Sequence, residues 1–221
     1  MKTIELNQPV TAANDKDAEL LRASLSDSGL LLINLMSAAG SGKTTLLSRT
    51  IRDLKEKVNI GVMEADLASD VDALSIEALG ARSIQVHTGG CCHMDAFMTG
   101  EALAEFDTTD LDLLFLENVG NLICPAEYDT GAHKNVMILS VPEGDDKPLK
   151  YPLMFEKSDV LLITKTDVLP YFDFDLDAVK ERVLHLNPSI RIFPVSAKTG
   201  DGMDAWEAWL QGSLSAGEAH A

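Results

Sequence analysis

A glycine-rich segment follows the first apolar run of the chain and leads into a predicted helix. Residues 37–45 read SAAGSGKTT, which matches the nucleotide-binding pattern GxxxxGK[ST] except that Ser37 stands in place of its first glycine. Glycines let successive backbone N–H groups point at phosphate oxygens, while Lys43 supplies charge to the β and γ phosphates and Thr44 offers a hydroxyl to Mg²⁺. A glycine-rich turn without a ligand is the alternative, but the order of strand, loop and helix favours phosphate binding. We therefore expect the phosphate contacts to come from Gly40, Ser41, Gly42, Lys43, Thr44 and Thr45.

Two polar strand ends later in the chain have the chemistry to select a base. The apolar run 160–163 ends in Thr164-Lys165-Thr166-Asp167, and the run 190–195 ends in Ser196-Ala197-Lys198, which resemble the NKxD and SAK elements of GTPases. A carboxylate at Asp167 can accept hydrogen bonds from the N1–H and the exocyclic amine of guanine, whereas adenine offers no matching donor pair. Thr164 replaces the usual Asn, and a polar strand end without a ligand is the alternative for either element. Their order after the phosphate loop favours guanine, bound by Lys165, Asp167, Ser196, Ala197 and Lys198.

A third strand end supplies a carboxylate and a glycine at the spacing of the DxxG switch of many GTPases. The run 111–116 leads into Glu117-Asn118-Val119-Gly120. We expect Glu117 to approach Mg²⁺ or its waters and Gly120 to sense the γ-phosphate. Asp66 is a further candidate for binding Mg²⁺ or positioning water, with Asp70 behind it, and a solvated surface position is the alternative for both. The predicted catalytic residues are Lys43, Asp66 and Glu117, and the predicted magnesium ligands are Thr44, Asp66 and Glu117.

A cysteine and histidine pair offers a different kind of metal chemistry. Cys92-His93 follows two glycines, and Cys124 lies 32 residues later, just beyond the switch segment. Thiolates and imidazole suit zinc and nickel rather than magnesium. A cysteine buried as a small hydrophobe is the alternative. Cys91 can add a fourth ligand only if it lies in a loop, because neighbouring side chains diverge on a helix, and His87 and His133 are interpreted as ordinary polar residues.

Seven largely apolar runs, with helical patterns between most of them, predict the fold that positions these residues. Such alternation predicts βαβ units and a mostly parallel open sheet of about seven strands flanked by helices, the α/β arrangement of P-loop NTPases, with ligands at the carboxyl ends of the strands. The expected strands are 31–36, 59–63, 82–86, 111–116, 136–141, 160–163 and 190–195, and the expected helices are 15–26, 42–57, 70–79, 93–106, 175–186 and 203–211.

Composition limits the domain count and the classes of partner. A chain of 221 residues with 46% hydrophobic content forms one substantial core, so we expect a single domain over 13–212 between a flexible N-terminus at 1–12 and a flexible tail at 213–221. The net charge of −17 opposes nonspecific binding to nucleic acid or anionic lipid. No run approaches the roughly 20 apolar residues of a membrane span, and the N-terminus does not resemble a secretory signal, so we expect a cytoplasmic protein.

Three longer segments resemble a known family. They are GGCCHMDAFM (89–98), LFLENVGNLICPAEYDTG (114–131) and SVPEGDDKPLKYPLMFEKSDVLLITKTD (140–167), and they are similar to the nickel-incorporation GTPases of hydrogenase maturation, the HypB family. The resemblance spans about residues 13–212. It implies hydrolysis of GTP to GDP and phosphate, a zinc or nickel site at Cys92, His93 and Cys124, and control of dimerisation and metal release by the bound nucleotide.

The same resemblance implies the partners. These are a second copy of the chain in a GTP-dependent homodimer, a small zinc-containing nickel chaperone and the hydrogenase large-subunit precursor. Residues 1–14 lack the cysteine motif or histidine-rich tract with which some members bind nickel tightly, and Phe97 stands where some relatives offer another histidine. The alternatives are a urease-type nickel-insertion GTPase, which typically has Cys-Pro-His, and a nonhydrolytic scaffold that binds guanine nucleotide without metal.

A charged segment provides one further hypothesis about the dimer. Residues 143–150 read EGDDKPLK and follow a predicted strand end on the edge where ligands gather. We predict that this loop crosses the dimer and presents Lys147 or Lys150 to the partner's nucleotide, and a solvated loop is the alternative.

Overall fold

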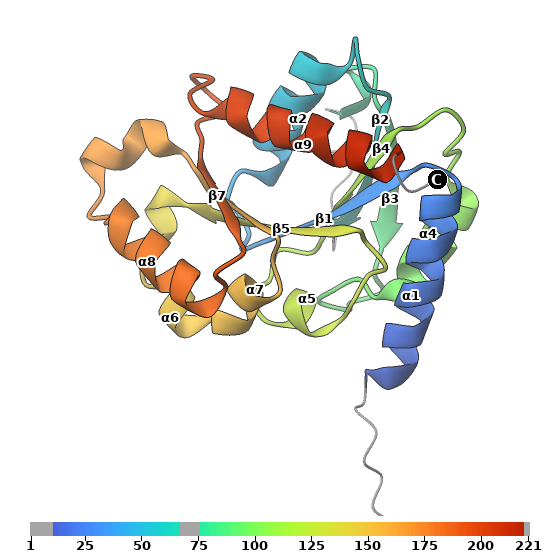
Figure 1. The fold of residues 1–221 in the computed structure, drawn as a ribbon, viewed down its shortest axis with the longest axis horizontal. Coiled ribbons are helices and arrows are strands. Elements are labelled where there is room, and N and C mark those ends of the chain that lie inside the picture. The colour runs from blue at the N-terminus through green and yellow to red at the C-terminus, as the bar shows by residue number, and fades with distance from the viewer. Residues whose placement is uncertain (1–10, 67–75, 219–221) are drawn as a thin grey trace, which may run out of the picture.

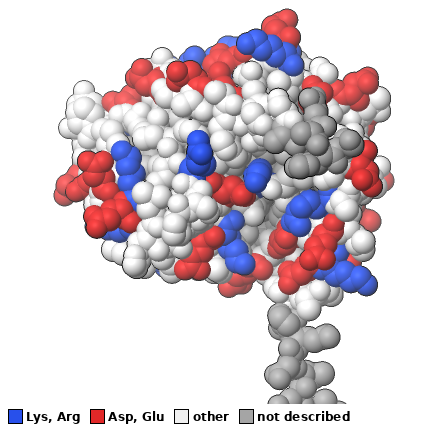
Figure 2. Space-filling model, in the orientation of Figure 1, with Lys and Arg blue, Asp and Glu red and all other residues white. Residues whose placement is uncertain are grey.

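The structure is a computed structural model that describes residues 11–66 and 76–218 (Figure 1). Among these residues, no helix has the length and apolar character needed to cross a membrane. On the face shown in Figure 2, Asp and Glu side chains are spread widely, and Lys and Arg side chains lie among them. The whole sequence has a net charge of −17.

A seven-stranded sheet in which every pairing is parallel forms the centre of the molecule. Its spatial order is β3-β2-β4-β1-β5-β6-β7, so the carboxyl ends of all strands meet at one edge. The predicted α/β class with seven strands is therefore confirmed. The strands are β1 (Leu31–Ser37), β2 (Ile60–Asp66), β3 (Arg82–His87), β4 (Leu113–Glu117), β5 (Lys134–Ser140), β6 (Val160–Thr164) and β7 (Arg191–Pro194).

Helices cover both faces of the sheet, which explains why the strands read as continuous apolar runs (Figure 1). Along β1, Ile33 and Leu35 pack under α2 and α9, while Leu32 and Met36 face the helices of the opposite layer. The helices are α1 (Ala12–Asp27), α2 (Lys43–Leu54), α4 (Ala96–Glu105), α5 (Cys124–Glu127), α6 (Lys147–Lys150), α7 (Pro152–Glu156), α8 (Leu176–Leu186) and α9 (Met203–Glu218), with 3-10 turns η1 (Val141–Glu143) and η2 (Thr166–Tyr171).

Several helix boundaries differ from the sequence-based expectation. Helix α1 begins at Ala12 rather than at 15, and α2 ends at Leu54 rather than at 57. Helix α4 begins at Ala96 rather than at 93, because the Asp95 side chain accepts a hydrogen bond from the Met98 N–H and caps the helix there. Helix α9 continues to Glu218 instead of ending at 211, because Leu214 packs against the core below the helix. The predicted helix at 70–79 lies largely outside the described residues, as do 1–10 and 219–221.

The segment predicted as a loop at 143–150 is folded more tightly than expected. Ser140 and Glu143 form a reciprocal cap, in which the Glu143 carboxylate accepts from the Ser140 N–H and Oγ, both at 2.7 Å. Helix α6 then places Lys150 against Asp146 in an ion pair, one turn apart. Lys147 makes no ion pair with any described residue.

Candidate nucleotide and metal sites

A pocket of about 420 Å³ lies at the carboxyl ends of the central strands. It is lined by Ala39, Gly40, Gly42, Lys43, Thr44, Thr45, Glu64, Ala65, Glu117, Asn118, Gly120 and Lys165. A larger hollow of about 740 Å³ at the opposite edge, between Lys134, Arg191 and Trp209, contains none of the predicted site residues. The chemistry-bearing residues therefore gather at the edge where a parallel sheet of this kind binds its ligands.

Hydrogen bonds within the phosphate loop explain why Ser37 fits in place of glycine. Gly42 has φ 96°, a left-handed conformation that favours glycine, and it caps the start of α2. The buried Ser37 hydroxyl accepts hydrogen bonds from the Lys43 ammonium at 2.9 Å and from the Ser41 hydroxyl at 2.7 Å. The serine thus supplies a hydrogen-bond acceptor that orients Lys43, the lysine predicted to bind phosphate.

Two buried carboxylates, Glu64 and Glu117, line the nucleotide pocket together with Thr44. The Thr44 hydroxyl donates to Glu117 Oε1 at 3.4 Å, and Glu117 is 8% exposed. Glu64, on the neighbouring strand β2, stands directly opposite Glu117 in the sheet register and is only 2% exposed. Asp66 ends β2, but its side chain lies outside the described part of the chain, as does Asp70.

Oxygen atoms of this kind are the ligands that Mg²⁺ prefers, so Thr44 and Glu117 fit the ion. Sequence reasoning missed Glu64, because the second strand was expected to end at Met63. The strand instead continues to Asp66, so that Glu64 lies inside it. The sequence did contain a signal for Glu64: this carboxylate directly follows the apolar run, with no turn residue to end the strand before it.

Residues 164–167, the first predicted base-recognition element, form hydrogen bonds with the second element at 196–198 and with the phosphate loop. Ser196 Oγ donates to Asp167 Oδ1 at 2.8 Å, so the predicted base carboxylate is oriented by the second element. Lys165 Nζ donates to the Gly40 carbonyl at 2.7 Å, and Thr164 Oγ1 donates to the Ser41 carbonyl at 2.8 Å. Thr164 therefore makes a bond between strand end and phosphate loop, and Ala197 and Lys198 follow Ser196 on the same turn.

Gly120 lies so close to the phosphate loop that no side chain fits. A Cβ added at this position would stand 2.9 Å from the Ala39 backbone nitrogen and 3.0 Å from Ala39 Cα. The segment after β4 therefore packs directly on the backbone of the predicted phosphate loop.

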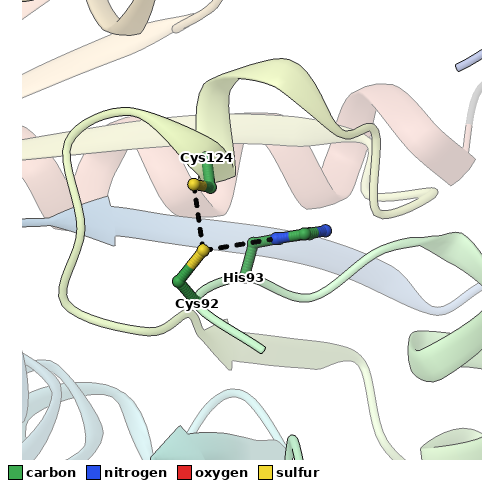
Figure 3. A group of neighbouring side chains, drawn as sticks. All are labelled: Cys92, His93 and Cys124. Carbon is green, nitrogen blue, oxygen red and sulfur yellow. Dashed lines mark hydrogen bonds between the residues drawn. The ribbon is translucent and has the colours of Figure 1, made fainter. Parts of the chain in front are cut away.

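The cysteine and histidine residues form a second cluster beside this pocket (Figure 3). Among the described residues, Cys92, His93 and Cys124 are the group whose ligand atoms lie within 4.8 Å of one another. The two sulfurs face each other at 2.9 Å, and the His93 ring stacks on Tyr128 with centroids 4.0 Å apart. Sharing a proton with Cys92, together with burial, raises the pKa of the Cys124 thiol.

Loop geometry decides which cysteines belong to the cluster. Because α4 starts at Ala96, the Cys92-His93 pair lies in the preceding loop and not at the helix entrance. Cys91 is exposed in the same loop and outside the cluster of three. His133 instead accepts a hydrogen bond from the Leu32 N–H at 3.0 Å, a structural role in which burial lowers its pKa. A soft divalent metal fits the two sulfurs and one imidazole that remain.

The parallel sheet, the phosphate loop and the strand-end motifs define a P-loop nucleotide-binding protein, which also has a cluster of two cysteines and one histidine with the chemistry to hold a metal ion. The family model "CobW/HypB/UreG, nucleotide-binding domain" matches residues 31–194. The hydrogenase maturation factor HypB of Azotobacter vinelandii is 46% identical over 210 residues, which are 95% of this chain and 69% of that protein. The chain therefore belongs to the HypB family of hydrogenase maturation factors.

Two further comparisons concern the metal. The crystal structure of HypB from Helicobacter pylori in complex with nickel has a TM-score of 0.87 and 37% identity, and the match covers 92% of this chain and 95% of that chain. A relative from Helicobacter hepaticus, described as a hydrogenase/urease maturation factor HypB, is 43% identical over 201 residues, 89% of this chain and 82% of that protein. The sequence-based assignment to this family is confirmed.

Proposed function

We propose that the protein is a GTP-hydrolysing nickel metallochaperone that assists nickel insertion into a hydrogenase, with metal binding coupled to the nucleotide state. One observation supports this most strongly. The segment after β4 begins in the nucleotide pocket at Glu117 and reaches the metal cluster at Cys124, seven residues later. A rearrangement of this segment around the γ-phosphate changes the position of one metal ligand relative to the other two.

The nucleotide part of the proposal assigns a role to each group in the pocket. Lys43 and the backbone of residues 40–45 bind the phosphates, and Thr44 and Glu117, with Asp66 as a further candidate, hold Mg²⁺. Asp167, oriented by Ser196, accepts the guanine donors. Magnesium neutralises the charge that develops on the phosphates during hydrolysis.

Nickel is the proposed cargo of the second cluster, and zinc is the competing ion. Two sulfurs and one imidazole nitrogen are ligands that both ions accept, and the Helicobacter pylori relative was crystallised with nickel. Zinc prefers tetrahedral ligation whereas Ni²⁺ accepts square-planar ligation by nitrogen and sulfur. A change in the distance between Cys124 and the Cys92-His93 pair therefore alters the preference for one ion over the other.

A GTP-dependent homodimer is proposed because large apolar side chains are exposed in the segments that follow β5 and β6. Leu149 is 66% exposed and Leu153 37% exposed after β5, while Tyr171 is 82% exposed and Phe172 45% exposed after the adjacent strand β6. Exposed large apolar side chains are typical of interaction surfaces. Lys147 is the lysine that we propose contacts the partner's nucleotide, since Lys150 pairs with Asp146. A small zinc-containing nickel chaperone and the hydrogenase large-subunit precursor are the proposed further partners.

Two substitutions test the central proposal. Lys43→Ala removes the ammonium from the phosphate loop, so GTP binding and phosphate release should fall together while nickel still binds in the absence of nucleotide. Cys124→Ser removes one metal ligand, so nickel content should fall while GTP turnover without metal persists. Unchanged GTP turnover in Lys43→Ala would exclude the assigned phosphate loop, and unchanged nickel content in Cys124→Ser would exclude the assigned metal cluster.

A urease is a second candidate recipient of the nickel. The observation that favours it is the Helicobacter hepaticus relative, which is described as a hydrogenase/urease maturation factor. Deletion of the gene from its host, followed by assays of both enzymes with and without added nickel, distinguishes the two. Loss of hydrogenase activity alone supports the first candidate, and loss of urease activity supports the second.

A further inference from the structure

Asn118 lies between the nucleotide pocket and the metal cluster and contacts both sides. It follows Glu117 at the end of β4, lines the nucleotide pocket and is 0% exposed. Its Oδ1 accepts hydrogen bonds from the Met94 N–H at 3.1 Å and from the Val119 N–H at 2.9 Å. Met94 is the residue directly after His93, so this bond ties the switch segment to the metal-bearing loop that follows β3.

The orientation of the Asn118 amide is determined by its surroundings. Two backbone N–H donors require an oxygen on one side, and the Nδ2 on the other side donates to Asn34 Oδ1 at 3.0 Å. Asn34 lies on β1 and in turn donates to Asn135 Oδ1 on β5 at 2.9 Å. The chain of three amides anchors Asn118 to the strand that leads into the phosphate loop.

This bond gives the nucleotide site a shorter route to the metal cluster than the chain itself. Six residues lie between Glu117 and Cys124 along the chain, whereas two residues and one hydrogen bond, Asn118 to Met94, lie between Glu117 and His93. A second bond between the same loops, from Asn121 Nδ2 to the Cys92 carbonyl, is exposed and longer at 3.4 Å. The buried bond is the stronger tie, because solvent does not compete for its partners.

We infer that Asn118 is the positioning residue through which the nucleotide state reaches the Cys92-His93 half of the metal cluster. The inference rests on the proposed function, because it needs a metal whose affinity depends on the nucleotide. When the switch segment moves around the γ-phosphate, Asn118 carries the Met94 backbone with it. The His93 ligand then shifts relative to Cys124, and the metal affinity changes.

Asn14 provides a matched control of the same residue type. From α1, its Nδ2 donates to the Asp129 carbonyl at 2.9 Å and its Oδ1 accepts from the Ala96 N–H at 2.9 Å. It therefore also joins the two metal-bearing segments, but it lies outside the nucleotide pocket. Asn14→Ala should weaken metal binding by the same factor in every nucleotide state, whereas Asn118→Ala should remove the difference between states.

The experiment measures nickel affinity by chelator competition in the GDP-bound and nonhydrolysable-GTP-bound states. The full chain is compared with Asn14→Ala, Asn118→Ala and Asn118→Asp, and Co²⁺ absorption reports the ligand geometry in each. Wild type and Asn14→Ala should show affinity ratios between the two states on the order of tenfold, a typical coupling. In Asn118→Ala, the nickel affinities of the two nucleotide states should differ by no more than about twofold. Its Co²⁺ spectrum should no longer change with the nucleotide. Asn118→Asp retains the oxygen that accepts from Met94 but loses the Nδ2 donor to Asn34, so it should retain part of the ratio.

The outcomes separate this inference from the function on which it rests. Equal affinities in the two states of the wild type would contradict the proposed coupling. A wild-type ratio that persists in Asn118→Ala, or that is lost in Asn118→Asp as fully as in Asn118→Ala, would overturn the role of Asn118. If Asn118→Ala does not fold, hydrogen exchange of the Met94 amide in the wild type tests the role of Asn118 instead. Its protection should differ between the two states, and equal protection overturns the inference.

Discussion

Replacing Gly120 with alanine tests whether the switch segment and the phosphate loop act as one unit. The new Cβ would lie 2.9 Å from the Ala39 nitrogen, whereas ordinary contact begins at 3.4 Å, so one of the two backbones must move by about 0.5 Å. The obstacle is backbone and not the end of a flexible side chain, so rotation of a side chain cannot relieve it. Overpacking of this kind costs about 1–3 kcal/mol.

The cost should appear in nucleotide binding, because Ala39 belongs to the loop that contacts phosphate. If the whole cost of about 1–3 kcal/mol opposes nucleotide binding, GDP and GTP affinities fall by about 5- to 150-fold, because about 1.4 kcal/mol corresponds to a tenfold change. The assay is titration of a fluorescent guanine nucleotide, with a thermal melt in its absence to measure any cost to the fold. Gly100→Ala on α4 is the control, because a Cβ there meets nothing within 4 Å. Nucleotide affinity equal to wild type in Gly120→Ala would refute the contact and the argument built on it.

Three further predictions address the base, the fold and the dimer. Asp167→Asn should shift preference from GTP toward xanthosine triphosphate, because an amide can donate to the xanthine carbonyl, and competition binding that shows no shift would count against Asp167. Burial and then the charge of Asp53 raise the pKa of Glu207 from 4.5 to about 7, so native stability falls as pH rises through this range. Glu207→Gln should therefore raise stability by roughly 1 kcal/mol at about pH 8, after allowance for solvent screening, and by nothing near pH 4.5, as measured by denaturant titration at both pH values. Tyr171→Ser should weaken the GTP-dependent dimer by about tenfold or more in sedimentation, with Leu184→Ser, at another exposed apolar position, as the control.

The sheet and the motifs were predictable because their signals are local. Strands buried on both faces need continuous apolar runs, and the phosphate loop and the two base elements each occupy fewer than ten consecutive residues. Helix ends were less predictable, since they depend on single contacts. The cap at Asp95 starts α4 and the packing of Leu214 extends α9, and neither contact follows from helical periodicity.

The connections between the sites could not be read from the sequence. Glu64 meets Glu117 only because β2 lies beside β4, an order that a strand pattern does not specify. The bond from Met94 to Asn118 spans 24 positions and joins loops after two strands that do not pair with each other. Such contacts depend on topology, so the sequence predicted the candidate ligands and only the structure showed the hydrogen bonds between their loops.

The central claim is that one protein binds nickel with an affinity set by its nucleotide. The most direct measurement is the equilibrium nickel affinity of the wild-type chain without nucleotide, with GDP and with a nonhydrolysable GTP analogue. The account predicts that the GDP and GTP values differ by at least about fivefold, and that nickel changes the relative affinity for the two nucleotides by the same factor. Identical nickel affinities in all three states would contradict it and leave two adjacent sites without coupling.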